Sequence, residues 1–164
     1  GSELAHVLSY TELLENNIII PDNVALLDTM GSRQGAVIAE YLVQNGAKLV
    51  HFITQLSHPY SDLSSSRDWG KVHKMLKQKN VVYHVDCEVI KIENDSVILK
   101  DIYNNQISNI ENIQKVVLVL GSVSNSQLYD IMKKVVESYI IGDAVAGRRV
   151  NDAIMEGEFI ARKI

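Results

Sequence analysis

A short apolar run, a glycine-containing turn and an amphipathic helix follow one another early in the chain, and this order restricts the fold more than any other feature. Val24-Ala25-Leu26-Leu27 is typical of a buried strand, and Ala36 to Asn45 of a helix closed by Gly46. Asp28 to Gly35 lies between them and is typical of a turn. Strand, turn and helix in this order open the folds that hold dinucleotides, where the helix N-terminus meets the pyrophosphate. The sequence therefore predicts an α/β domain of nucleotide-binding type.

The turn keeps only part of the glycine pattern G-x-G-x-x-G. That pattern needs one glycine for the tight turn, a second for close approach of the pyrophosphate and a third for packing of helix on strand. Counted back from Ala39 to Leu42 in the helix, these positions fall at Met30, Ser32 and Gly35, with Gly31 as an additional glycine. We predict that Gly31, Ser32 and Gly35 contact any nucleotide that binds here.

The second predicted strand, Lys48 to Thr54, lacks the acidic residue that should follow it. A carboxylate at this point accepts a hydrogen bond from the adenosine ribose, and an arginine accommodates a 2′-phosphate. Here the next carboxylate is Asp62 and the next arginine is Arg67. Two alternatives stay open: an intact NAD(P)H site, or a nucleotide site that has lost its cofactor, which Asp28 and Met30 in the turn also favour.

The middle of the chain predicts a loop, a helix and then several short strands. Ser57 to Ser66 is serine-rich and predicts a mobile loop, in which His58 is a solvated residue rather than a catalytic one. Asp68 is predicted to cap a helix from Trp69 to Gln78, with Trp69 at the edge of the core. From Asn80 onward the apolar residues follow a period of two, with a hairpin turn at Asn94-Asp95. The predicted strands are Val81–His84, Glu88–Ile92, Ser96–Lys100, a return over Ile107–Ile113, and the buried run Val116–Leu120.

The end of the chain contains a second candidate site. Ile140-Ile141 predicts a short buried strand, Gly142-Asp143 a turn, and the residues after them a helix to Ile164. A strand that brings Gly-Asp to a helix N-terminus places a carboxylate beside exposed N–H groups, which is a common way to hold a sugar-phosphate chain. We predict Gly142 and Asp143 as cofactor-binding residues, with the alternative that Asp143 only caps the helix.

This closing stretch resembles the segment that ends the long members of the old yellow enzyme group. These include 2,4-dienoyl-CoA reductase, trimethylamine, dimethylamine and histamine dehydrogenases and related NADH:flavin oxidoreductases. The family pattern is I-G-D-A-x-A-P-R-x-x-x-x-A-x-x-x-G, in which Gly147 replaces the proline, and the matching residues are Ile141, Gly142, Asp143, Ala144, Ala146, Arg148, Ala153 and Gly157. The resemblance implies that Asp143 meets a flavin ribityl chain or a nucleotide ribose. It also implies the fold class, a Rossmann-like parallel sheet with an inserted β-meander, as in FAD/NAD(P)-binding domains of the glutathione-reductase type.

The same resemblance implies a function. The chain would be the nucleotide-binding-type domain of a larger flavin-dependent oxidoreductase and would not be catalytic alone. NAD(P)H, or ADP or FAD, would bind in the full-length protein, whereas FMN and an iron-sulfur cluster would lie outside this chain. The partners would be an adenine nucleotide and the rest of the parent polypeptide, namely an FMN barrel and a flavin-type half. Two alternatives stay open: a structural or docking domain with a degenerate nucleotide site, and an independent small α/β binding module.

We expect four segments along the chain. Gly1-Ser2 is typical of a remnant of an expression vector. Residues 3–23 are predicted to be a linker with a short helix, since Ser9 and Glu12 have the spacing of a capping box. Residues 24–136 would form the NAD(P)-binding-type domain, with a helix from Gln127 capped by Ser124 or Asn125. Residues 137–164 would be a returning segment of the flavin-type half, whose last helix packs one face on a sheet through Val150, Ile154, Phe159 and Ile160.

Composition excludes several classes of function. The net charge of −4 and pI near 5.7, without a cluster of basic and aromatic residues, argue against a nucleic-acid partner. No apolar run approaches the roughly 20 residues that span a bilayer, so no membrane partner is predicted. Cys87 is the only cysteine, which excludes an internal disulfide, argues against a thiolate metal site and fits a cytoplasmic location. Its acidic neighbours indicate a packing residue, and we predict neither catalytic nor metal-binding residues.

Overall fold

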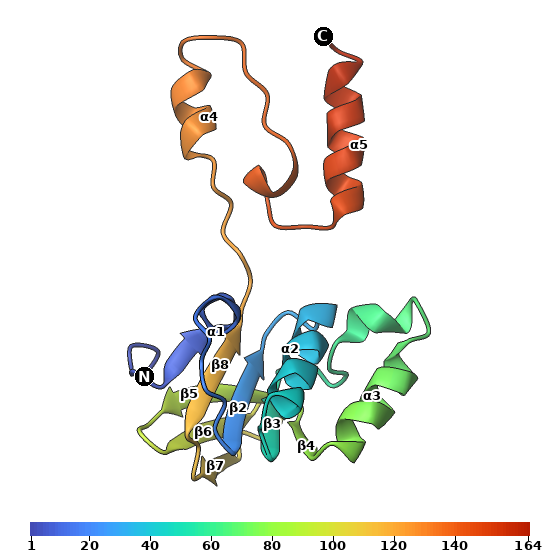
Figure 1. Cartoon of the computed structure of the whole chain (residues 1–164). Helices are drawn as coiled ribbons and strands as arrows, with labels where there is room; N and C mark the ends of the chain where they lie inside the picture. The colour runs from blue at the N-terminus through green and yellow to red at the C-terminus, as the bar shows by residue number, and fades with distance from the viewer. The chain divides into compact units, whose positions relative to one another are not determined.

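The computed structural model describes all 164 residues, from Gly1 to Ile164. They form two compact units, Gly1–Leu120 and Gly121–Ile164, which we describe separately (Figure 1). The division falls earlier than the boundary after residue 136 that the sequence suggests. The helix that begins at Gln127 therefore belongs to the second unit.

A parallel sheet of five strands, in the order β1-β8-β2-β3-β4, forms the middle of the first unit. The strands are β1 (Val7–Ser9), β2 (Asn23–Asp28), β3 (Leu49–Ile53), β4 (Val81–His84) and β8 (Lys115–Val119). The sequence predicts all of these except β1, which lies in the predicted linker. Three residues are too few to show a period, and β1 is defined by its pairing with β8, far along the chain.

Helices cover one face of this sheet. They are α1 (Tyr10–Glu15), α2 (Arg33–Gln44), the 3₁₀ turn η1 (Ser61–Ser64) and α3 (Trp69–Gln78). The core between helices and sheet contains Leu13, Val24, Leu26, Ile38, Leu42, Val50, Phe52 and Leu76, with Trp69 partly buried at its edge as predicted. Successive side chains of a strand point to opposite faces, so Val24 and Leu26 of β2 pack in this core, whereas Ala25 between them packs on the other face of the sheet.

Only one of the two predicted caps in this layer is formed. At the start of α1, the Glu12 N–H donates to Ser9 Oγ (3.2 Å) and the Ser9 N–H donates to Glu12 Oε2 (2.7 Å), which confirms the capping box. Asp68 stands at the N-cap of α3 but makes no side-chain cap hydrogen bond. Its backbone is helical (φ −85°, ψ −17°), whereas a capping side chain needs an extended backbone.

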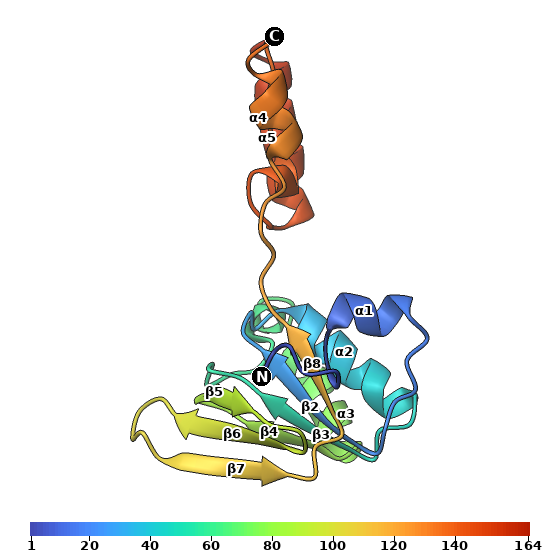
Figure 2. The ribbon, with the colours of Figure 1, turned by 90° about the vertical axis from the view of Figure 1, so that its left-hand side faces the viewer.

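An antiparallel meander covers the other face of the sheet. It consists of β5 (Cys87–Ile92), β6 (Ser96–Asp101) and β7 (Ile107–Glu111), and the predicted hairpin turn is closed by a hydrogen bond from Glu93 N to Ser96 O (2.8 Å). A second core joins the two sheets through Ala25, Ile53, Ile92, Val97, Leu99, Ile110 and Val116. In Figure 2 the helices lie on one side of the parallel strands and the meander on the other. The predicted fold class, a Rossmann-like parallel sheet with an inserted β-meander, is confirmed.

The second unit has helices but no strand. It contains α4 (Gln127–Met132), the 3₁₀ turn η2 (Gly142–Ala144) and α5 (Val150–Ala161). The strand predicted at Ile140-Ile141 is not formed, although Ile141 is extended (φ −141°, ψ 164°), because a strand exists only when a neighbour accepts and donates its hydrogen bonds. The N-cap of α4 is Ser126, without a side-chain cap bond, instead of the predicted Ser124 or Asn125.

The second unit also lacks a buried hydrophobic side chain, since every such residue of the protein lies before Leu120. Val150, Ile154 and Phe159 of α5 are 72%, 63% and 59% exposed, so the helix face predicted to pack on a sheet is uncovered. None of the helices of the chain is long and apolar enough to cross a bilayer.

Candidate nucleotide site

The carboxylate of Asp28 lies inside the turn between β2 and α2. Asp28 is fully buried, and its Oδ1 accepts hydrogen bonds from the N–H groups of Met30 (2.9 Å) and Gly31 (3.2 Å). Its Oδ2 is buried without a hydrogen-bond partner. Burial raises the pKa of Asp28, the two backbone hydrogen bonds oppose that shift, and the charge of Asp62 adds to it. The backbone N–H groups of Met30 and Gly31 are therefore already bonded to the Asp28 carboxylate and are not free for a ligand.

The predicted residues Gly31, Ser32 and Gly35 lie together at this turn. Gly31 has φ +60°, and a Cβ atom there would collide with the Leu56 side chain and lie 3.2 Å from Ser61 Oγ. A Cβ atom at Gly35 would collide with the Asp28 carboxylate and lie 3.1 Å from Phe52 Cζ. Glycine at position 35 thus permits close packing of α2 against the strand. The group that fills the space beside it is the Asp28 carboxylate.

Ser32 is the N-cap of α2 and makes no side-chain cap hydrogen bond. The Gly35 N–H donates to the carbonyl oxygen of Ser32 (3.2 Å). The first N–H groups of a helix lack the usual partner four residues earlier, so those of Arg33 and Gln34 point to water or to a ligand. This end of α2 has the geometry through which nucleotide folds hold a pyrophosphate.

A segment that overlaps the predicted mobile loop Ser57–Ser66 covers the turn. We call residues Leu56–Leu63 the strap. Besides the contacts of Leu56 and Ser61 with Gly31, the Asp62 N–H donates to the carbonyl oxygen of Gly31 (3.3 Å). Tyr60 and Leu63 in the strap are buried, which the prediction of a polar loop did not include. The signal in the sequence was the apolar residues Tyr60 and Leu63 within the serine-rich run.

Tyr60 anchors the strap to α3 and β4. Its hydroxyl lies 2.7 Å from His73 Nδ1 and 2.9 Å from the Tyr83 hydroxyl, and burial raises its pKa. The Trp69 Nε1–H donates to Pro59 O (2.9 Å). Tyr60 has a left-handed backbone (φ 42°), which costs about 1–3 kcal/mol for a residue other than glycine. The surrounding contacts must offset that strain, so they define one position for the strap.

The end of β3 offers no carboxylate to a ribose. Thr54 is buried, its Oγ1 accepts a hydrogen bond from Leu56 N (3.2 Å), and Gln55 is exposed. Asp62 returns to the Gly31 turn, where its Oδ1 is buried without a partner. Arg67 is exposed. Neither Asp62 nor Arg67, the next carboxylate and arginine in the sequence, thus takes the place of the missing carboxylate at the end of β3.

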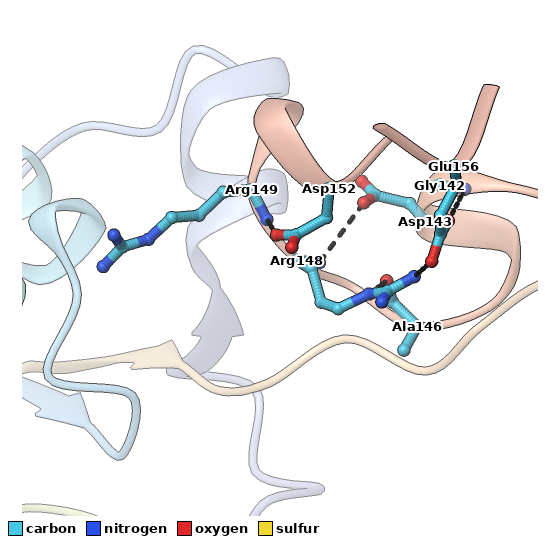
Figure 3. Close-up of polar contacts among 7 residues, drawn as sticks. All are labelled: Gly142, Asp143, Ala146, Arg148, Arg149, Asp152 and Glu156. Atoms are coloured by element: carbon cyan, nitrogen blue, oxygen red, sulfur yellow. Dashed lines mark hydrogen bonds and ion pairs between the residues drawn. The ribbon is translucent and has the colours of Figure 1, made fainter. Parts of the chain in front are cut away.

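Gly142 and Asp143 form a separate candidate site in the second unit (Figure 3). Gly142 is buried at φ +63°, its N–H donates to Glu156 Oε2 (2.7 Å), and Arg148 pairs with Oε1 of the same carboxylate. The bond from Gly142 and the bond from Arg148 both lower the pKa of Glu156.

Asp143 has an exposed side chain, and its Oδ1 accepts one long hydrogen bond from Arg148 N (3.3 Å). The alternative in which Asp143 caps the last helix is wrong, since α5 starts at Val150 and Asp152 Oδ2 accepts the Arg149 N–H there (3.1 Å). The Asp143 carboxylate therefore remains accessible to a ligand.

The other titratable groups indicate packing. Burial raises the pKa of the Cys87 thiol, Asp101 and Asp86 add to the shift, and the side chain packs on the second core. His58 is exposed beside Trp69. His51 Nδ1 lies 3.0 Å from His84 Nε2, and burial followed by the charge of His84 lowers the pKa of His51 to about 4. No group of three or more His, Cys, Asp or Glu side chains is placed to hold a metal ion.

Solved structures similar to this chain belong to much larger enzymes. The 6-hydroxypseudooxynicotine amine oxidase of Pseudomonas geniculata N1 matches 97% of the chain with 24% of its own length, at a TM-score of 0.87 and 23% identity. Histamine dehydrogenase of Rhizobium sp. 4-9 matches 96% of the chain with 26% of its length (TM-score 0.85, 22% identity). A 2-naphthoyl-CoA reductase matches 100% of the chain with 24% of its length (TM-score 0.80, 21% identity). The chain thus spans about a quarter of the length of each of these proteins.

The class of fold follows from these matches, which also include a flavoprotein disulfide reductase of Escherichia coli. It is the fold found in FAD/NAD(P)-binding domains of disulfide-reductase type, a parallel sheet with a three-stranded meander. The resemblance seen in the closing segment is confirmed as a likeness of structure, because histamine dehydrogenase is one of the enzymes it points to. No family model matches the sequence, and no curated protein matches it.

Proposed function

We propose that this chain is the nucleotide-binding-type domain, with a returning segment, of a larger flavin-dependent oxidoreductase of the NADH:flavin oxidoreductase or amine dehydrogenase kind. It does not turn over a substrate alone. The observation that carries the proposal is the match of both units together to about a quarter of an amine oxidase, a dehydrogenase and a CoA-ester reductase. The FMN barrel, the iron-sulfur cluster and the flavin-type half would lie in the rest of the parent polypeptide.

The second unit supports a role as a returning segment. It has no hydrophobic core of its own, and Ile141 is extended without a partner strand. A sheet edge in the parent polypeptide would supply that partner, and the exposed apolar residues of α5 would pack beside it. In this arrangement the accessible Asp143 carboxylate and the Gly142 backbone would meet the ribityl chain or ribose of a flavin or adenine nucleotide.

The test is expression of the full reading frame to which Glu3 belongs. We expect the purified protein to carry flavin absorbance, and the amides of residues 138–161 to exchange hydrogen more slowly than in the present chain alone. Amides of β2 and β8 serve as the control, because they are buried in the first unit and should exchange alike in both proteins. Equal exchange of residues 138–161 in both proteins would contradict a returning segment.

Within this domain, two roles are possible for the turn after β2. In the first, an adenine nucleotide binds at Gly31, Ser32 and Gly35, as the strand-turn-helix geometry and the uncapped N-terminus of α2 favour. In the second, the domain is a scaffold with a degenerate site, as the buried Asp28 carboxylate and the strap over Gly31 favour. The scaffold role has the stronger support, because the Asp28 carboxylate would repel a phosphate group and the Leu56 side chain fills the space through which a nucleotide would approach Gly31.

Calorimetric titration with ADP, NADH, NADPH and FAD, one at a time, separates the two roles. A scaffold predicts no heat of binding for any of them. A micromolar response to NADH or NADPH would establish the first role, and a response to ADP alone would indicate an amine-dehydrogenase-like nucleotide site.

A further inference from the structure

The strap occupies the approach to the turn after β2 from outside. The Leu56 side chain occupies the place where a Cβ atom of residue 31 would stand, and Ser61 Oγ lies 3.2 Å from that place. The Asp62 N–H donates to the carbonyl oxygen of Gly31 (3.3 Å). In nucleotide folds the glycine-rich turn is exposed so that the pyrophosphate can approach the backbone. Here Gly31 is buried by residues of the same chain.

Asp28 occupies the turn from inside. Its Oδ1 accepts the N–H groups of Met30 and Gly31, and its buried Oδ2 contacts Gly35 and has no hydrogen-bond donor. A pyrophosphate at the N-terminus of α2 would meet this carboxylate and that of Asp62 at short range, where water screens charge poorly. The electrostatic and the steric obstacle therefore act at the same place.

Tyr60 holds the strap in this position. It is fully buried against Phe52, with the two rings at 88° and their centroids 5.7 Å apart, and its hydroxyl bonds to His73 and Tyr83. The hydrogen bond from Trp69 to Pro59 adds a second attachment. Opening the strap requires these buried contacts to break.

We propose that the strap and Asp28 form an internal plug over a latent adenine-nucleotide site, in which Leu56 closes the turn to the pyrophosphate and Asp28 repels it. The N–H groups of Arg33 and Gln34 at the uncapped start of α2 are the donors that a diphosphate would use once the plug is removed. This inference deepens the scaffold role of the turn and concerns residues of this chain alone. Its failure leaves the proposal of a larger parent enzyme in place.

The test is calorimetric titration of ADP into four forms of the chain: wild type, Leu56→Ala, Asp28→Asn and the double variant. Asn at 28 keeps an oxygen acceptor for Met30 and Gly31 but removes the charge. Ile107→Ala is the matched control, because it truncates an exposed side chain on β7, in the meander. We expect no heat of binding from wild type or Ile107→Ala and detectable ADP binding by each single variant. The double variant should bind ADP at least about tenfold more tightly than either single variant. Circular dichroism of each variant checks that it is folded.

Two results would overturn the plug. Equal ADP affinity of wild type and double variant would mean that strap and Asp28 do not exclude the nucleotide. Absence of ADP binding in a folded double variant would mean that something else closes the turn. Adenosine, which lacks phosphate, should bind no more tightly to the Asp28→Asn variant than to wild type, because the removed charge acts on the diphosphate.

A second variant tests the anchor. Tyr60→Phe keeps the ring that packs on Phe52 but removes the hydrogen bonds to His73 and Tyr83. We expect faster hydrogen exchange confined to residues 56–63 and a rise in ADP affinity smaller than that of Leu56→Ala. Unchanged hydrogen exchange of residues 56–63 would mean that the Tyr60 hydroxyl does not hold the strap in place.

Discussion

The two units of this chain differ in how they bury apolar side chains. The first unit has two hydrophobic cores, one on each face of a parallel sheet, whereas the second has no buried hydrophobic residue. Both contain amphipathic helices, so helical pattern alone does not produce a core. A helix needs a sheet or another helix to pack against, and the second unit offers only α4, η2 and short extended segments. The first unit therefore has the buried cores of a domain, whereas the second has none.

The largest expected effect comes from separating the units. Residues 1–120 alone should unfold cooperatively at nearly the same urea concentration as the whole chain, because all buried hydrophobic residues are retained. Residues 121–164 alone should be mostly unstructured, since helices of 6 and 12 residues without burial are marginal in water. Far-UV circular dichroism and urea denaturation measure both. A cooperative unfolding transition of the 121–164 peptide would show that the second unit folds alone, which contradicts this contrast between the units.

Truncating one apolar side chain in each unit sharpens the contrast. Leu26→Ala in β2 should lower the free energy of unfolding by about 2–5 kcal/mol, because the side chain is fully buried and a cavity remains. Ile154→Ala in α5 should change it by less than about 0.5 kcal/mol, because that side chain is 63% exposed. Urea denaturation of both variants gives the two values. Similar losses would mean that α5 contributes to a common core.

Adding a methyl group at one glycine of each unit should give opposite results. Gly35→Ala should destabilise by about 1–3 kcal/mol, because the new Cβ atom meets the buried Asp28 carboxylate and Phe52. In Gly157→Ala the Cβ atom lies 3.6 Å from Ile141 Cδ1, an ordinary contact, and alanine favours the helix. We expect no loss for Gly157→Ala, measured as helical signal and unfolding midpoint. A tolerated Gly35→Ala would show that α2 and Asp28 can move apart.

The smallest effect concerns helix caps. Ser9→Ala removes the capping box of α1 and should lower stability by about 0.5–2 kcal/mol. Ser126→Ala at the N-cap of α4 removes no cap hydrogen bond, so its unfolding midpoint should match that of wild type. Thermal denaturation of the two variants side by side is sufficient. A larger effect at Ser126 than at Ser9 would indicate that α4 is more ordered than its contacts suggest.

The local sequence pattern predicted most helices and strands of the first unit. It failed where a strand or a loop depends on residues far away in the sequence. Period-two runs and the turn at Asn94-Asp95 predicted the meander, because a hairpin is specified by neighbouring residues. Strand β1 was not predicted although it forms, and the strand predicted at Ile140-Ile141 does not form. Both errors have the same cause. A strand is defined by its partner, and the sequence shows one strand at a time. The buried position of Tyr60 in a serine-rich run depended in the same way on α3 and β4.

For the candidate site, the sequence by itself determined which residues stand at the turn: the position of Gly35, the lost glycines at Met30 and Ser32, and the absent carboxylate after β3. These properties follow from spacing along one strand, turn and helix. Only the tertiary structure decided that the Asp28 carboxylate fills the turn from inside and that the strap covers it from outside. The direction of a buried side chain and the path of a loop depend on what packs against them, and those contacts join residues that are far apart in the chain.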